Sequence, residues 1–280
     1  MVGLIHGCVT VFRYQIVIPA TVLLIWLFIA IAEPWLPLQP NDIALDNILQ
    51  SPSLSEWLGY DDLGRPILDR LLVGAQTSFM VGFWVIFLSL TVGTLLGTFS
   101  AWLGGYADLI FVRLMDVFLA FPGILLAIAL SGILGPGIEN VVFALSCVGW
   151  VGFARLARAQ TLSLKHRVHV LAALALGAKI PRILRHHILP LLIAPLLVEA
   201  TFGIAGVVIA EAGLSFLGLG VQPPTASWGS MIRDGTSYML VAPHIVLAPG
   251  LALLLVVLSV NILGDKLRDR LDVKSWDRNQ

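Results

Sequence analysis

The sequence is poor in charged residues and in cysteine. Only 12% of its 280 residues are charged, whereas 58% are hydrophobic. Soluble domains average about 25% charged residues, so this shortage indicates an integral membrane protein surrounded by lipid. The two cysteines, Cys8 and Cys147, give no basis for a disulfide framework. The formal net charge is zero, so the overall charge does not indicate a polyanionic partner such as nucleic acid.

Catalytic signatures are also missing. The sequence contains no G-x-x-x-x-G-K-[ST] loop, so the chain itself is not expected to bind or hydrolyse ATP. It contains neither H-E-x-x-H nor G-x-S-x-G, which leaves no support for an intramembrane hydrolase. Four histidines lie close together in the sequence, but their pattern does not predict a metal site: His166, His169, His186 and His187. We therefore predict a protein that is not an enzyme and has no cofactor of its own.

Long apolar runs dominate the rest of the chain. A helix needs roughly 20 apolar residues to span a bilayer, and an open strand in lipid would leave its backbone groups unpaired. Four runs are comfortably long enough, and the first and fourth are near the short limit. The pattern predicts an all-α membrane protein with six transmembrane helices, divided into residues 1–70 (the first helix and an external loop) and residues 71–280 (a five-helix core). The six runs are 16–32, 77–103, 109–134, 138–154, 188–217 and 241–264.

The distribution of lysine and arginine predicts the orientation. With the N-terminus inside, 14 of the 17 basic residues fall on the cytoplasmic side, in agreement with the positive-inside rule. The external loop 33–70 is instead rich in Asp and Glu. Both termini are therefore expected in the cytoplasm, as is the polar segment 155–189.

A short apolar stretch, Val170–Leu176, lies inside this cytoplasmic segment. It is too short to span a bilayer. Its alanines favour a helix, Gly177 permits a break after it, and Pro181 does not fit a helix interior. The pattern predicts a short helix, a sharp turn and a second, basic helix that ends at Pro190. Two roles remain open from the pattern alone, namely a helix on lipid headgroups and a helix that docks on another protein.

The same stretch resembles a known motif. Leu171-Ala-Ala173, Gly177 and Ile188-Leu-Pro190 are similar to the "EAA" loop of permease subunits of bacterial ABC importers. The resemblance extends over about residues 55–275 and is greatest to the second, "C-type", permease of the dipeptide/oligopeptide/nickel group. The other motifs that carry it are Asp62–Arg65, Arg113–Asp116, Phe121-Pro122, Leu134–Gly137, Gly149-Trp150, Ala154-Arg155, Ser215–Gly220, Gln222–Pro224, Ser227–Gly229, Gly264-Asp265 and Leu267–Asp269.

This resemblance implies a type I ABC importer permease fold in a bacterial inner membrane. It also implies several partners: a second homologous permease, two ATPase subunits that hold the ATP and magnesium, and a periplasmic substrate-binding protein. The expected cargo is a dipeptide or oligopeptide, and nickel or a metal–chelator complex is the alternative within the family. The short helix would be a coupling helix that docks on the ATPase, through Val170, Leu171, Ala172, Ala173, Leu174, Gly177 and Ala178. Leu171 stands where the family usually has Glu, which predicts a more apolar contact.

Two further groups of residues are candidates for function. The first is a stiff outer segment that forms either a gate or binding-protein contact or a simple rigid loop: Gln222, Pro223, Pro224, Trp228 and Gly229. The second group consists of charges within apolar runs, which are costly in a membrane and often functional. Asp116, Glu199 and Glu211 are expected either to line the pathway or to bond a neighbouring helix.

An ion-coupled secondary transporter is the rival from another class. Such transporters often contain inverted repeats and ion ligands near the membrane midplane. The sequence shows neither a repeat nor a cluster of carboxylates in the middle of its apolar runs. A partner that binds nucleotide would separate the two possibilities.

Overall fold

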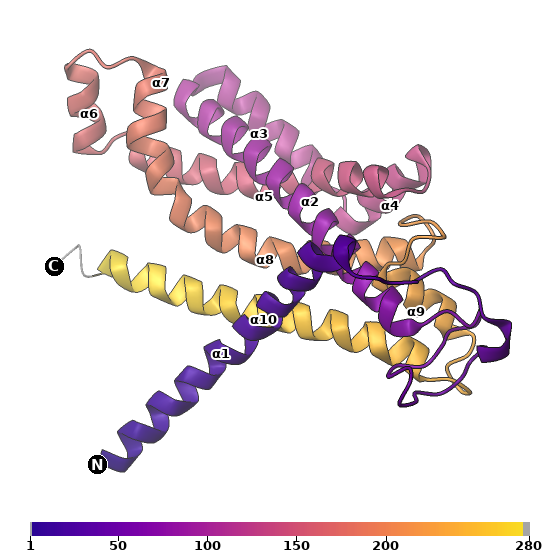
Figure 1. The fold of residues 1–280 in the computed structure, drawn as a ribbon. Helices are drawn as coiled ribbons and strands as arrows, with labels where there is room; N and C mark the ends of the chain where they lie inside the picture. The colour runs from indigo at the N-terminus through magenta and orange to yellow at the C-terminus, as the bar shows by residue number, and fades with distance from the viewer. Residues whose placement is uncertain (1, 277–280) are drawn as a thin grey trace.

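The computed structural model describes the backbone of residues 2–276 and the side chains of residues 16–271. Helices account for almost all of the regular structure in this part of the chain (Figure 1), and the one β-type pairing there is an isolated bridge between Tyr60 and Pro66. The α-helices are α1 (Val2–Ala32), α2 (Ile67–Leu103), α3 (Gly105–Leu119), α4 (Gly123–Leu134), α5 (Ile138–Leu164), α6 (Val168–Ala175), α7 (Ile180–Ile183), α8 (Leu189–Phe216), α9 (Trp228–Thr236) and α10 (His244–Trp276). Three short turns of other helix types are η1 (Glu33–Trp35), η2 (Leu45–Asn47) and the π-helical η3 (Leu184–Ile188).

Five helical segments of the described chain are long and apolar enough to cross a membrane, and a sixth crossing results if α3 and α4 count as one broken span. This agrees with the six predicted apolar runs. The five segments are Ile16–Trp35, Ile67–Leu103, Ile138–Leu164, Ile180–Phe216 and His244–Leu271.

The third predicted run, 109–134, is not one straight helix. α3 and α4 meet at an angle of 83°, and the break falls at Phe121-Pro122. Proline lacks the amide hydrogen that would continue the helix, and it disfavours helical geometry at the residue before it. The apolar composition predicts a membrane location for this run, but the proline makes it a bent pair of helices.

Helices α2 and α5 form the most extensive helix pair in the bundle. Gly93 and Gly97 lie directly against α5, where an added side chain would collide with the backbone carbonyl groups of Trp150 and Ala154. Small residues spaced four apart allow two helix backbones to approach this closely. The G-x-x-x-G motif is therefore the contact that joins the second span to the fourth.

Helix α5 extends further than its apolar run suggests. α5 continues to Leu164, so Arg155 and Arg158, which the sequence places in the cytoplasmic loop, lie inside a helix. Alanine and arginine both favour helical backbone, and Arg158 is neutralised within the bundle by a two-bond contact to Asp108, at 2.6 and 2.7 Å. The polar composition of this turn therefore does not end the helix.

The bundle has two distinct ends (Figure 1). α6 and α7 project from one end, and the last turns of α10 lie toward the same side. The loop that joins α1 to α2 lies at the opposite end, together with α9. This arrangement places the predicted docking segment and the predicted outer segment on opposite sides of the membrane-spanning part.

Candidate functional site

The predicted short docking helix exists as α6 and ends as expected. Leu176 N donates to Ala172 O at 3.0 Å, and Ala178 N donates to Ala173 O at 3.0 Å, which closes the last turn. Gly177 has a φ of +77°, a left-handed conformation that glycine adopts at little cost. The chain therefore turns sharply after α6 and returns toward the membrane through α7 and η3.

The two faces of α6 differ. Val170 is 0% exposed and packs inside this subunit, and Ala173 and Ala178 are half-buried. Leu171, Ala172 and Leu174 are exposed. The side chain of Val170 therefore anchors α6 to its own chain, and the ATPase contact expected of this residue stays a prediction. Four large apolar side chains are left uncovered on α6 and directly after it: Val168, Leu171, Leu174 and Leu176.

The anchoring of α6 comes from the segment that follows it. Ile183 in α7 and Ile188 in η3 are both 0% exposed, which fixes the base of the loop on the bundle. The rings of His169 and His187 lie 6.2 Å apart across the same loop. A π-helical turn inside a longer helix often marks a functional position, and η3 connects the α6 loop directly to α8.

The outer segment is mostly buried. Trp228 is 2% exposed, and its Nε1 donates to Leu71 O at 3.0 Å. Gly229 lies against the backbone of Ala212, with no space for a side chain. Trp228 and Gly229 were predicted to belong either to a gate or binding-protein contact or to a rigid loop, and in the structure they join α9 to α2 and α8.

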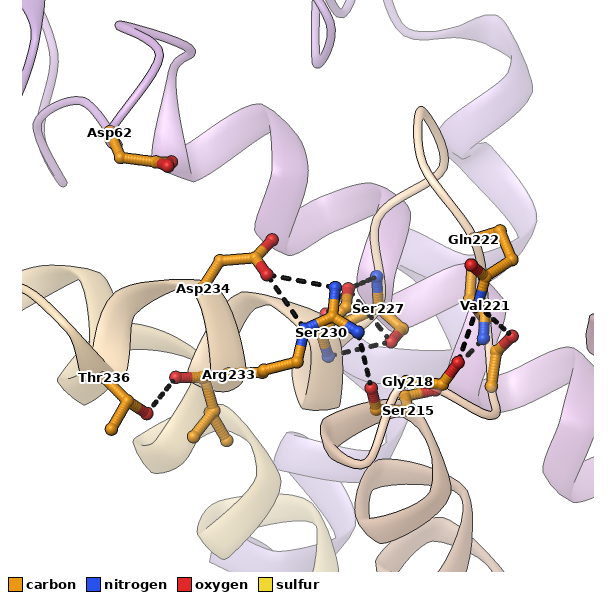
Figure 2. Close-up of polar contacts among 12 residues, drawn as sticks. Asp62, Ser215, Gly218, Val221, Gln222, Ser227, Ser230, Arg233, Asp234 and Thr236 are labelled. Carbon is orange, nitrogen blue, oxygen red and sulfur yellow. Dashed lines mark hydrogen bonds and ion pairs between the residues drawn. The ribbon is translucent and has the colours of Figure 1, made fainter. Parts of the chain in front are cut away.

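An exposed tip remains in front of this buried part, made of Gln222, Pro223 and Pro224. Gln222 Nε2 donates to Gly218 O at 3.0 Å and to Gly220 O at 3.1 Å, so the tip is held by its own backbone. Figure 2 shows the contacts that support it. Ser227 and Ser230 cap the start of α9 reciprocally. Only the tip is open to an external partner.

Figure 2 also shows how Arg233 ties α9 to the end of α8. Its Nε lies 3.0 Å from Asp234 Oδ1, and its Nη1 donates to Ser215 O at 3.4 Å. Asp62 lies in the same region. Its burial, and to a smaller extent the negative charge of Asp61, raise the pKa of its carboxyl group above the usual value. The carboxylate of Asp234 in α9 also raises this pKa, so a charge of α9 acts on the α1–α2 loop.

Glu211 bonds a neighbouring helix and does not face a pathway. It is 1% exposed, and it accepts hydrogen bonds from Ser78 at 3.1 Å and from Ser215 at 2.8 Å. Ser78 belongs to α2, so the contact joins α2 to α8 beneath the outer segment. Hydroxyl donors satisfy both carboxyl oxygens, as a buried polar group requires.

Glu199 and Asp116 are placed differently. Both are exposed on this subunit. Asp116 Oδ2 lies 3.5 Å from Arg113 Nη1 on the same helix. Glu199 reaches across to α5, where a side chain at Gly152 would come within 3.2 Å of its Oε1. These two of the three predicted charges remain available to line a pathway.

Sequence reasoning missed an ionic cluster at the outer end of α2. Asp61 Oδ2 lies 2.7 Å from Arg65 Nε and 3.4 Å from Arg70 Nε, and all three residues are buried. Asp61 Oδ1 also accepts from two backbone amides. The cluster locks the α1–α2 loop onto α2. The close spacing of one acid and two bases in a short external segment was the available signal.

Comparisons with known proteins identify the family. Residues 93–274 match the family described as "Binding-protein-dependent transport system inner membrane component". The chain is 44% identical over 228 residues to the dipeptide transport system permease protein DppC of Alkalihalophilus pseudofirmus, which covers 81% of this chain and 75% of that protein. It is also 44% identical over 234 residues to the glutathione transport system permease protein GsiD of Escherichia coli, which covers 84% and 77%.

The fold is also found in a solved structure. An inward-facing structure of the MetNI methionine ABC transporter matches with a TM-score of 0.54 at 19% identity, over 73% of this chain and 95% of that one. At this identity the similarity concerns the fold alone. Taken with the family match and the two relatives, it shows that the chain belongs to the binding-protein-dependent transport system inner membrane component family and is a permease subunit of an ABC importer.

Proposed function

We propose that this permease imports short peptides across a bacterial inner membrane as one half of a two-permease pathway. The relatives named for dipeptide and glutathione transport support this cargo class, because dipeptides and the tripeptide glutathione share a small size and charged termini. In this proposal a periplasmic binding protein delivers the peptide at the α9 end. Nickel has no comparable support among these relatives.

The single observation that carries the proposal is the exposed apolar face of α6. A soluble loop has no use for four uncovered apolar side chains at one end of a bundle, and exposed apolar patches often mark protein interfaces. The face is held rigidly from behind by Val170 and Ile183, both 0% exposed. A rigid support lets a force applied to α6 reach α8 through the continuous helical segment Ile180–Phe216.

The proposed partner on this face is an ATPase subunit. ATP and magnesium would bind there, so this chain would need no cofactor and would not hydrolyse ATP. Closure of two ATPases would move two coupling helices and bias the bundle between its two open states. Both termini and α6 then lie in the cytoplasm, which agrees with the basic residues that follow α5 in residues 165–185 and with those in residues 266–278.

The substitution Ala172→Arg tests the docking. Ala172 is exposed, so the variant should fold, but a large unpaired charge would enter the contact, where burial is costly. We expect recovery of the ATPase by co-purification, and hydrolysis stimulated by the binding protein, to fall about tenfold, corresponding to roughly 1.4 kcal/mol. Ser163→Arg is the matched control, because Ser163 is exposed near the end of α5, outside α6. Unchanged ATPase recovery with Ala172→Arg would show that α6 lies on lipid.

A further inference from the structure

A cavity of about 620 Å³ lies between α3 and α5 and is lined by charged as well as apolar residues. Asp116 contributes from α3, and Gly152 and Arg155 contribute from α5. Gly152 is also the residue against which the Glu199 carboxylate lies, at 3.2 Å from the position of an added side chain. Glu199 therefore reaches the edge of the same cavity from α8.

Arg155 and Glu199 lie at matching levels in the bundle. Arg155 is 17 residues from the start of α5 at Ile138, and Glu199 is 17 residues from the end of α8 at Phe216. At about 1.5 Å per residue, each lies about 25 Å from the α9 end of its helix. A hydrocarbon core about 30 Å thick that begins at the α9 end of these helices would include this position, toward its cytoplasmic side.

Neither charge is neutralised by its own chain. Both side chains are exposed, and among the side chains that the structure describes neither forms an ion pair or a side-chain hydrogen bond. Arg158, one turn further along α5, is fully engaged by Asp108. A free charge that faces hydrocarbon is costly, so intramembrane charges face either the interior of an assembly or water.

We propose that Arg155 and Glu199 form a transient binding site for the peptide on the wall of the translocation pathway. Arg155 binds the terminal carboxylate, and Glu199 binds the terminal ammonium group. Glu199 lies against Gly152, and Gly152 and Arg155 are separated along α5 by less than one turn of about 5.4 Å. An extended dipeptide spans at most about 7 Å. This inference rests on the proposed peptide cargo and adds the residues that contact it.

Cysteine labelling tests whether this wall meets water. Cys8 and Cys147 are first replaced by Ser and Ala, and Glu199→Cys is compared with Leu197→Cys in the assembled transporter. Leu197 is also exposed, but it lies in an apolar hollow between α2 and α8, on the opposite side of α8. We expect a water-soluble methanethiosulfonate reagent to modify Glu199→Cys and not Leu197→Cys. Failure to modify Glu199→Cys, or equal modification at both positions, would place the charge in a subunit contact and overturn the proposal.

Peptide uptake tests the role of the charges. In vesicles containing the complete transporter, Arg155→Gln and Glu199→Gln should each lower dipeptide uptake about tenfold, the size expected for losing a charge-assisted hydrogen bond. Hydrolysis stimulated by the binding protein should stay within about twofold of the unsubstituted level, and Arg155→Lys, which keeps the positive charge but not the fork of donors, should retain more uptake than Arg155→Gln. Uptake that is unchanged, uptake that falls together with hydrolysis, or no rescue by Lys would each overturn the site. Absence of stimulated hydrolysis in the unsubstituted transporter would instead overturn the proposed function.

Discussion

The two ends of this subunit carry apolar segments of similar appearance that behave in opposite ways. At one end, α6 exposes Leu171 and Leu174 and buries only Val170 fully. At the other end, Trp228 and Met231 of α9 are buried, at 2% and 4% exposed, and only the tip at 222–225 remains open. Apolar residues outside the spans therefore do not by themselves mark an interface. The contacts behind them decide whether a segment is a surface or part of the core.

The difference lies in what each segment packs against. α6 lies at the end of a projecting loop (Figure 1) and has few neighbours besides α7. α9 contacts α2, α8 and α10, which surround it closely. A helix of eight residues that is exposed on one side is marginal on its own, so within this chain α6 depends on the burial of Val170, whereas α9 is supported by three neighbouring helices.

Substitution of Trp228 gives the largest expected effect on this comparison. Trp228→Ala removes a buried ring and the hydrogen bond to Leu71 O, and losses of this kind cost about 3–5 kcal/mol in folded proteins. The purified variant should melt at a much lower temperature in detergent, both with and without partner proteins. Gln222→Ala, at the exposed tip, is the control and should leave the melting temperature unchanged. A Trp228→Ala variant with unchanged melting temperature that loses only the ATP hydrolysis stimulated by the binding protein would show that α9 forms a contact surface.

Removal of the Glu211 carboxyl group comes second. Glu211→Leu leaves the hydroxyl groups of Ser78 and Ser215 buried without their partner, which costs roughly 1–3 kcal/mol. Glu211→Gln keeps acceptor and donor capacity at the same place and should be much milder. Thermal unfolding of the two variants side by side measures the difference. Equal stability would show that these hydrogen bonds do not hold α2 to α8.

Replacement of Leu171 by Glu is expected to have a small effect at the opposite end. Leu171 is 49% exposed, so a carboxylate can stay in water, and Glu is the residue that the resembled family usually carries there. ATPase recovery should change about twofold or less, in the range of most surface substitutions. A loss as large as that of Ala172→Arg would mean that Leu171 is deeply buried in the contact and that this subunit has a docking surface of its own type.

Much of this architecture could be predicted from the sequence because lipid allows few alternatives. Apolar length gave the spanning segments, and the alanines and Gly177 gave α6 and its sharp end. Each of these follows from a local rule about backbone hydrogen bonds or side-chain size. The short helix and the spans are therefore the features that the structure confirms.

The features that the sequence left open or missed depend on distant parts of the chain. For Trp228 the sequence allowed either a contact surface or a rigid loop, and in the structure its ring packs beside Trp26, 202 positions earlier in the chain. Arg155 was assigned to a loop because it is charged, but α5 continues past it. For Glu211 the sequence allowed either a pathway position or a helix contact, and the position of Ser78 opposite it shows the helix contact. Local patterns do not report which segment lies against which.

The smallest expected effect concerns Asp62, at the margin of the buried end. Its pKa is raised first by burial and then by Asp61, with Asp234 adding to the effect and Arg65 opposing it. The folded protein therefore holds this proton more tightly than the unfolded chain does, so protonation stabilises the fold at low pH, and this contribution is lost as the pH rises through the raised pKa. Asp62→Asn, which cannot ionise, should raise the free energy of unfolding at neutral pH by less than about 1 kcal/mol. The melting temperature should therefore rise slightly.

That advantage of Asp62→Asn should shrink as the pH falls toward the ordinary carboxyl value of 3.8, because the unsubstituted Asp62 is then protonated as well. Asp46→Asn is the control, since Asp46 is exposed on the same loop. Melting curves of both variants across this pH range decide the matter. A stability advantage of Asp62→Asn that grows toward low pH would have the wrong sign. It would show that the ion pair of Asp62 with Arg65 (3.6 Å) stabilises the charged carboxylate by more than burial destabilises it.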